Sequence, residues 1–274
     1  MYNGKELKVL KTLEQIRSGE IKKYHAAAFV GGPGAGKSYL LATYPKFISA
    51  ITCPGEEDTF LNVPKLQKNV VGWEHFIPSD TETAPEVIER LKKFITEEVR
   101  PAITAGKCET FGLDNVTFLA EYFWMKKCTI DRHLYKTKGG EFDTRGAYAG
   151  LKDDLRDFFL TYVMSLPCNI VLTIHLMLET DEAMERKPDK TVRYNAAVLG
   201  SFRDKLAGMV SYMLYLEKKA IINKNGKPVM QYLARTDKSN GKPAKSRLQL
   251  PLLIEDISYT KLKQAIDLVM KGNK

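Results

Sequence analysis

Gly31-Gly32-Pro33-Gly34-Ala35-Gly36-Lys37-Ser38 is the most informative segment of the sequence, because it matches the pattern GxxxxGK[ST] at every fixed position. The apolar run Tyr24–Val30 precedes it, and Tyr39–Thr43 can start a helix. A strand, a glycine-rich loop and a helix in this order let backbone N–H groups surround phosphate oxygens. A glycine-rich turn without a ligand is the alternative, but the complete match and the preceding strand favour a phosphate-binding loop.

The residues of this loop have separate predicted roles. The Lys37 ammonium is expected to reach the β- and γ-phosphates of a nucleotide, and the Ser38 hydroxyl is expected to bind Mg²⁺. ATP and Mg²⁺ are therefore the predicted cofactors. The predicted nucleotide-binding residues are Gly31, Gly32, Pro33, Gly34, Ala35, Gly36, Lys37, Ser38 and Tyr39.

A magnesium site of this kind also needs a carboxylate at the end of a second strand. The apolar run Thr110–Leu113 ends in Asp114, whose carboxylate is expected to hold the magnesium directly or through water. The alternative is that Asp114 caps the N-terminus of a helix. We favour the metal role because the run lies downstream of a phosphate-binding loop.

Three further residues are candidates to act on the attacking water or on the phosphates. Glu56 and Glu57 follow the apolar run Phe47–Thr52, and either could orient or deprotonate water; a solvated acidic loop is the alternative. His175 ends the run Asn169–His175 and could hydrogen-bond the γ-phosphate, or be structural only. All three are expected at the C-terminal edge of the sheet, where α/β proteins bind ligands.

Short apolar runs alternate with amphipathic helical patterns along the chain. The spacing of apolar residues from Pro85 to Val99 predicts a helix that Arg100-Pro101 should end, and the stripe from Leu151 to Leu166 predicts another. Because the strands are apolar on both faces, the pattern predicts an α/β fold with a mainly parallel sheet flanked by helices. The predicted strands are Tyr24–Val30, Phe47–Thr52, Thr110–Leu113, Asn169–His175 and Met209–Leu216.

The C-terminal part has a different pattern. Two β-rich stretches, Ala220–Asn223 and Val229–Ala234, flank Asn225-Gly226 and predict a β-hairpin. Ser258 is expected to cap a terminal helix over residues 258–272. Because there is neither an internal repeat nor a Pro/Ser-rich linker, residues 1–274 are expected to form one domain with a core over about residues 22–250.

Composition and charge limit the possible partners. The chain has 274 residues, of which 44% are hydrophobic, and this excludes collagen-like, low-complexity and disordered proteins. No apolar stretch approaches the ~20 residues that cross a bilayer, and the first residues contain no apolar signal region. We therefore expect no membrane partner and a cytoplasmic location.

The net charge of +9 is concentrated in residues 218–247, a basic segment with nine basic residues and one acidic residue. This segment is expected to bind a polyanion.

Several blocks together resemble the RecA-like core of phage-encoded P-loop nucleotide-binding proteins, a group that includes the RecA-like single-strand annealing proteins of phages. The blocks are GGPGAGKSYL from Gly31, the acidic loop with Glu56 and Glu57, FGLDNVTFL from Phe111, and NIVLTIH ending at His175. The resemblance spans about residues 22–250. It implies a RecA-like fold and an oligomeric ATPase located in the cytoplasm of the phage's host.

The resemblance also implies how subunits cooperate. The segment Pro243-Ala244-Lys245-Ser246-Arg247 looks like the AKxR element that such phage proteins carry near the end of the core. In a homo-oligomer with nucleotide near the subunit interface, Lys245 and Arg247 would touch the γ-phosphate bound to the adjacent subunit, where a cation stabilises the transferring phosphoryl group. The alternative is that both bind nucleic acid or solvent. The stretches Asp131–Ala147 and Leu178–Leu199 correspond to the DNA-binding loops of RecA-like proteins.

Three functions are compatible with these features. We expect a Mg²⁺-dependent ATPase that binds single-stranded DNA in phage recombination or strand annealing, because the chain has a nucleotide site and a basic segment and because the family resemblance implies this role. One alternative is a nucleotide-switched assembly or DNA-packaging component with little turnover. The other is a P-loop phosphotransferase that acts on a small molecule.

Overall fold

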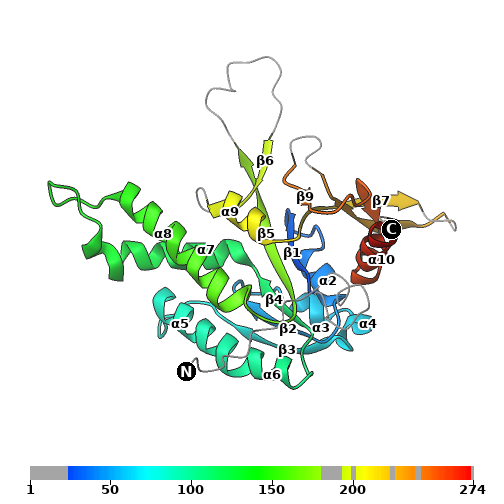
Figure 1. The fold of residues 1–274 in the computed structure, drawn as a ribbon, viewed down its shortest axis with the longest axis horizontal. Helices are drawn as coiled ribbons and strands as arrows, with labels where there is room; N and C mark the ends of the chain where they lie inside the picture. Colours follow the sequence, from blue (N-terminus) through cyan, green and yellow to red (C-terminus); the bar gives the residue numbers. More distant parts are fainter. Residues whose placement is uncertain (1–23, 180–192, 199–201, 223–225, 238–241, 273–274) are drawn as a thin grey trace, which may run out of the picture.

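The computed structural model describes residues 24–179, 193–198, 202–222, 226–237 and 242–272, which are built around one β-sheet (Figure 1). Its strands are β1 (Ala26–Gly31), β2 (Phe47–Ile51), β3 (Val70–His75), β4 (Thr110–Asp114), β5 (Asn169–Glu179), β6 (Arg193–Ala196), β7 (Tyr212–Ile222), β8 (Pro228–Arg235), β9 (Lys245–Ser246) and β10 (Leu253–Glu255). The order in space is β10-β8-β7-β1-β5-β4-β2-β3. From β7 to β3 neighbouring strands are parallel, whereas β8 and β10 add antiparallel at one edge. The predicted α/β fold with a mainly parallel sheet is confirmed.

Helices cover both faces of the sheet. Side chains of β1 alternate between two cores, since Ala28 and Val30 belong to one core and Ala27 and Phe29 to the other. The first core includes residues of α5 (Ala84–Phe94), α7 (Val116–Cys128), α8 (Thr144–Phe158) and α9 (Phe202–Met209). The second includes residues of α2 (Lys37–Ala42), α3 (Asp58–Leu61), α4 (Pro64–Gln67) and α10 (Tyr259–Gly272). Strands buried on both faces are apolar at successive positions, which explains the continuous apolar runs in the sequence.

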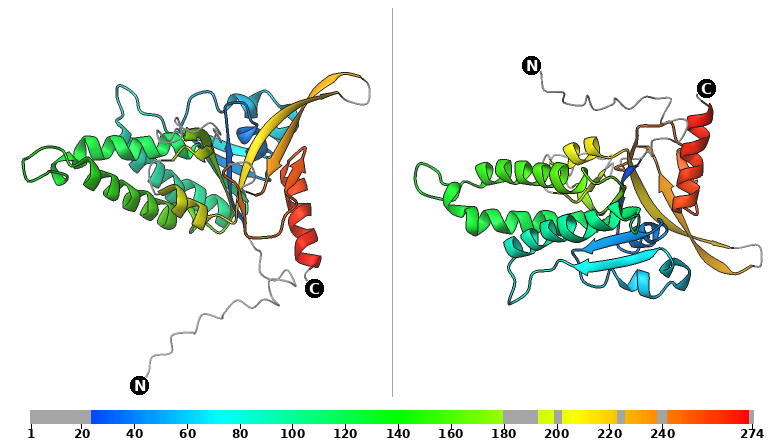
Figure 2. Two further views of the ribbon diagram at one scale, coloured as in Figure 1. Left: turned by 90° about the horizontal axis from the view of Figure 1, so that it is seen from above. Right: turned by 60° about the horizontal axis from the view of Figure 1, so that its bottom comes forward.

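Two strands run well beyond their predicted ends. β5 continues past His175 and β7 continues past Leu216. In each case the extension pairs with an antiparallel partner, β6 for β5 and β8 for β7, which satisfies backbone groups beyond the parallel part of the sheet. The predicted hairpin is therefore present with longer arms, and it projects from the body of the protein as a two-stranded ribbon (Figure 2).

One predicted helix end is wrong. The helix that begins with α5 does not stop at Arg100-Pro101 but continues through a π turn (Ile95–Val99) into α6 (Arg100–Thr104). In the π turn the N–H of Arg100 bonds to the carbonyl of Ile95, so the helix is widened just before a proline that has no N–H to donate. Pro101 then falls in the first turn of α6, where proline is tolerated.

The terminal helix begins as predicted. Ser258 Oγ accepts a hydrogen bond of 3.3 Å from the N–H of Lys261, and Leu262 is buried in the second core. The N–H of Tyr259 donates to Thr43 Oγ1 at 2.8 Å, which ties α10 to the end of α2. Among the described residues, no helix is long and apolar enough to span a membrane.

Candidate functional site

The glycine-rich loop lies at the C-terminal end of β1. Gly31 is in register with His175 of the neighbouring strand β5. Gly34 and Gly36 have φ angles of 69° and 91°, in the left-handed region that other residues rarely adopt. Gly36 also has no room for a side chain, because a Cβ there would lie 2.6 Å from the ring of Tyr232. Glycine at these positions therefore allows both the tight curvature of the loop and its close contact with β8.

Lys37 lies inside the loop and is only 5% exposed. Its Nζ donates hydrogen bonds to the carbonyl oxygens of Gly31 and Gly32, both at 3.1 Å. Burial lowers the pKa of Lys37, and the charges of Glu56 and Asp114 oppose this shift. Two carbonyl partners leave one of the three ammonium N–H groups for an anionic ligand.

Asp114 ends β4 and is fully buried. Its Oδ1 accepts a hydrogen bond from the hydroxyl of Thr173, whereas its Oδ2 has no hydrogen-bond partner among the described residues. Burial and the charge of Glu56 raise the pKa of Asp114 well above its ordinary value. A buried carboxylate oxygen without a donor is costly, and a cation beside it would remove that cost. The surroundings of Asp114 thus fit a bound divalent cation.

Ser38, at the start of α2, supplies a second oxygen for such a cation. Its hydroxyl donates a hydrogen bond of 2.7 Å to Glu56 Oε2 and is also one of the groups that lower the pKa of Asp114. Mg²⁺ prefers oxygen ligands and, when bound with a nucleotide, needs only one or two from the protein. No group of three or more His, Cys, Asp or Glu side chains that could hold a metal occurs in the described part of the chain. Ser38 and Asp114 therefore suit a metal that is shared with phosphates.

Asn115, and not Asp114, caps the helix that follows β4. Asn115 Oδ1 accepts a hydrogen bond of 3.1 Å from the N–H of Phe118 at the start of α7. This overturns the alternative that Asp114 is a helix cap. The carboxylate of Asp114 is therefore not used by the helix N-terminus.

His175 is held by the first turn of α7. Its backbone N–H donates to Thr117 Oγ1, and its ring Nε2 lies 3.0 Å from Asn115 Nδ2. Because Asn115 Oδ1 is taken by the helix N-terminus, the amide nitrogen faces His175 and can only donate, so Nε2 accepts and the ring is neutral. Burial and the charge of Lys37 lower the pKa of His175, in agreement with a neutral ring. Asn115 was not among the predicted site residues, although its place directly after Asp114 is a signal for it.

The two glutamates of the acidic loop have different surroundings. Glu56 lines the cavity over the loop and accepts the hydroxyl hydrogen of Ser38. Glu57 points to β3, where its Oε2 lies 3.1 Å from His75 Nε2. Burial would raise the pKa of Glu57, but hydrogen bonds from the backbone and from His75 outweigh it and hold that pKa below its ordinary value. The structure therefore brings Glu56, and not Glu57, to the phosphate-binding loop.

A cavity of about 450 Å³ opens over the loop. Its lining includes polar groups of Lys37, Ser38, Glu56 and His175. It also includes the aromatic rings of Tyr39 and Tyr232. A volume of this size is ordinary for small-molecule sites. Tyr232 was not among the predicted site residues, because nothing local to β8 indicates that this strand reaches the loop.

Comparison with known proteins is consistent with this geometry. Residues 23–248 match a protein-family model described as an AAA domain. The chain belongs to the AAA domain family. It accordingly contains a P-loop NTPase domain, of which the loop from Gly31 to Ser38 is the expected nucleotide-binding part. A place among the RecA-like annealing proteins of phages is a finer assignment and stays a prediction.

Two solved ATPase structures resemble this AAA domain at low identity. An ATPase from the type III secretion system of pathogenic bacteria is 16% identical with a TM-score of 0.42, over 70% of this chain and 50% of that chain. The ATP synthase subunit NeqB from Nanoarcheaum equitans is 15% identical with a TM-score of 0.44, over 71% and 46%. The AAA domain thus spans about half the length of either chain. No curated protein matches its sequence.

Lys245 and Arg247 lie away from the cavity of the AAA domain. Lys245 belongs to β9 and is in register with Met213 of β7. Lys245 Nζ donates to the carbonyl of Ala207 at 2.7 Å, and Arg247 Nη2 donates to the carbonyl of Gly208. These carbonyls are in the last turn of α9, where cations are favourable. Within one chain the two side chains therefore cap α9, and their action on a neighbour's nucleotide stays a prediction.

The basic segment of the AAA domain, residues 218–247, is less available than its composition suggests. Arg235 Nη2 lies 3.0 Å and Lys242 Nζ 2.7 Å from the carboxylate oxygens of Glu217, one residue before the segment. Burial would raise the pKa of Glu217, but Lys242 and Arg235 outweigh it and hold that pKa below its ordinary value. The predicted hairpin-like segment is also only partly a hairpin, because the chain returns to the sheet in β9. Lys218 and Lys219 are exposed, while Lys224 and Lys238 lie outside the described residues.

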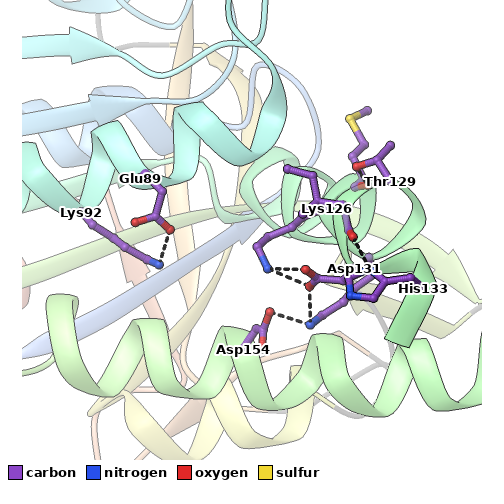
Figure 3. A network of polar contacts seen from close by, with 10 residues as sticks. Glu89, Lys92, Lys126, Thr129, Asp131, His133 and Asp154 are labelled. Carbon is purple, nitrogen blue, oxygen red and sulfur yellow. Dashed lines mark hydrogen bonds and ion pairs between the residues drawn. The ribbon is translucent and has the colours of Figure 1, made fainter. Parts of the chain in front are cut away.

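The stretch predicted as a first DNA-binding loop, Asp131–Ala147, is partly helical in this AAA domain. The carboxylate of Asp131 binds Lys126 at 2.7 Å and Lys127 at 2.9 Å, and Asp154 binds Lys127 at 2.7 Å (Figure 3). These ion pairs join α7, the 3₁₀ turn Ile130–Leu134 and α8. The first residues of the stretch are therefore part of a helical framework. Most of the second stretch, Leu178–Leu199, lies outside the described residues.

Proposed function

We propose that this AAA domain hydrolyses ATP with Mg²⁺ bound between Ser38, Asp114 and the phosphates of the nucleotide. The observation that carries the proposal is the buried carboxylate of Asp114. Its Oδ2 has no hydrogen-bond partner among the described residues, and Ser38 and Lys37 are near enough to lower its pKa. When bound there, Mg²⁺ neutralises charge on the β- and γ-phosphate oxygens.

Lys37 binds and orients the phosphates in this proposal. Its bonds to the carbonyls of Gly31 and Gly32 hold the ammonium inside the loop before any ligand binds. A cation held in advance loses little conformational freedom on binding and is aimed where negative charge develops.

Glu56 is the residue that we assign to the attacking water. One of its carboxylate oxygens accepts from Ser38, which leaves the other to accept a proton from water. Glu57 instead holds the acidic loop against β3 through the contact of its Oε2 with His75 Nε2.

His175 is assigned to detecting the γ-phosphate. Its Nε2 accepts from Asn115, so the hydrogen on the other ring nitrogen is available to a phosphate oxygen. Since β5 continues past His175 into its pairing with β6, the presence of the phosphate can be passed to that ribbon.

The proposal extends to single-stranded DNA and to a homo-oligomer. The basic segment, residues 218–247, has nine basic residues and one acidic residue, which supports contact with a phosphate backbone. In an oligomer, Lys245 and Arg247 would leave the carbonyls of α9 and reach the nucleotide of an adjacent subunit. The role in phage recombination or strand annealing rests on the sequence resemblance.

The test is phosphate release by the full chain, measured with and without single-stranded DNA at about 50 mM salt, where electrostatic binding is strong. We expect DNA to stimulate release and Lys37→Ala to abolish it. Absence of DNA binding under these conditions would refute the DNA part of the proposal.

The same assay separates the other two functions. Nucleotide-dependent oligomers seen by light scattering, with negligible phosphate release, would identify a switched assembly component. Labelled phosphate on an acceptor other than water would identify a phosphotransferase.

A further inference from the structure

The β7–β8 hairpin lies directly on the phosphate-binding loop. Lys218 of β7 and Tyr232 of β8 are cross-strand partners, so both side chains are on the same face of the hairpin. A Cβ at Gly36 would lie 2.6 Å from the ring of Tyr232, and a Cβ at Gly34 would lie 3.1 Å from Lys218 Nζ. Two side chains of one hairpin face thus contact two glycines of the loop.

Tyr232 contributes an aromatic ring to the lining of the cavity. Its ring stacks on that of Tyr39, with 5.1 Å between centroids and 15° between planes. Both rings line the same cavity as Lys37 and Ser38. A nucleoside triphosphate has the matching two-part chemistry, because it joins a flat aromatic base to a polyanionic tail. The ring that could stack on the base therefore comes from the hairpin.

Lys218 differs from other cations of the basic segment. Within the described part of the chain it forms no ion pair, whereas Arg235 and Lys242 are both bound to Glu217. Its ammonium lies against Gly34, in the loop that surrounds the phosphates. An ammonium without a carboxylate partner at this place is available to an anionic ligand.

We propose that the hairpin is part of the nucleotide site, with Tyr232 stacking on the base of a nucleoside triphosphate and Lys218 binding its phosphates. This inference rests on the proposed function and deepens it. It removes Lys218 from the cations available to DNA and makes the position of the hairpin dependent on the nucleotide.

The test compares two ligands on the full chain with Mg²⁺. One is a non-hydrolysable ATP analogue and the other is inorganic tripolyphosphate, which has the phosphates without the base; both are measured by displacement of labelled ADP. Tyr232→Leu should weaken binding of the analogue about tenfold, as expected for loss of one stacked base, and leave tripolyphosphate binding unchanged. Tyr232→Phe keeps the ring and should bind both ligands like the wild type.

Lys218→Gln should weaken binding of both ligands by the same factor. Lys219→Gln is the matched control, because the next residue of a strand points to the opposite face, and it should weaken neither.

Equal losses for the two ligands in Tyr232→Leu, or no loss at all, would overturn the base assignment. Identical behaviour of Lys218→Gln and Lys219→Gln would overturn the phosphate assignment. If the wild type binds the analogue and Lys37→Ala does not, while both hairpin variants bind normally, the hairpin inference fails and the proposed function stands. If the wild type does not bind the analogue, the proposed function itself fails.

Discussion

Ser38 Oγ donates a hydrogen bond of 2.7 Å to Glu56 Oε2. The bond joins the end of the phosphate-binding loop to the acidic loop and brings a carboxylate to the cavity. Because the hydroxyl hydrogen is engaged, the lone pairs of Ser38 are left for a cation. Glu57, the next residue, is paired with His75 instead, so two adjacent glutamates should respond differently to the same substitution.

Glu56→Gln should lower kcat for ATP hydrolysis by roughly 10²–10⁴-fold, because the amide cannot accept a proton from water. Glu57→Gln is the matched control and should leave kcat near that of the wild type. Steady-state phosphate release at saturating ATP measures both, and binding of a non-hydrolysable analogue checks that the site is intact. Equal effects of the two substitutions would remove Glu56 from the proposed role.

Asn115 has two tasks that two substitutions can separate. Asn115→Ser keeps a side-chain oxygen for the N-cap of α7, whereas Asn115→Ala does not, so alanine should be less stable than serine by about 1 kcal/mol. Neither variant can donate an amide hydrogen to His175, so both should lower turnover to the same degree. Urea unfolding and phosphate release measure the two effects. Recovery of full turnover with serine would show that the contact with His175 is not needed.

Glu217 should give a pH-dependent contribution to stability. Its pKa is held below the ordinary value of 4.5 by Lys242 and Arg235, against burial, so the stability that it contributes is present above pH 4.5 and lost as the pH falls through the folded-state pKa. Glu217→Gln should therefore lower the free energy of unfolding by about 1 kcal/mol at pH 7, and by progressively less as the pH falls below 4.5. Glu97→Gln, at an exposed position of the π turn, is the control. A deficit that does not change with pH would argue against the ion pairs.

Asp131→Ala should lower stability without changing nucleotide affinity. The side chain of Lys127 is 4% exposed, and loss of one of its two carboxylate partners should cost about 2 kcal/mol of unfolding free energy. Asp153→Ala removes an exposed ion pair with Arg156 and should cost less than about 1 kcal/mol. Because the Asp131 cluster lies at the end of α7 opposite Asn115, ATP affinity should be the same in both variants. A loss of affinity in Asp131→Ala alone would show that the two ends of α7 are coupled.

Features set by neighbouring residues were predictable from the sequence. The loop from Gly31 to Ser38 needs only its own glycines and the strand before it, and the apolar runs show directly that their strands are buried on both faces. The prediction that the helix ends at Arg100-Pro101 was wrong, because proline propensity takes no account of the π turn that widens the helix before Pro101.

Features set by distant residues were not predictable in the same way. Tyr232 reaches Gly36 only because β8 extends β7 at the sheet edge, and the sequence contains no local sign of that register. The net charge of residues 218–247 likewise does not predict that Arg235 and Lys242 are bound to Glu217, which lies outside that segment, in the folded protein. Similarly, Glu56 and Glu57 are equivalent by composition and differ only once His75 is placed beside one of them.

Phosphate release from ATP as a function of Mg²⁺ concentration decides whether the buried carboxylate of Asp114 holds the metal. The wild-type chain should release phosphate only with Mg²⁺, and Asp114→Asn should raise the Mg²⁺ concentration for half-maximal rate about tenfold or more. An Asp114→Asn variant that hydrolyses ATP with the same Mg²⁺ dependence as the wild type would contradict this assignment and the reaction built on it.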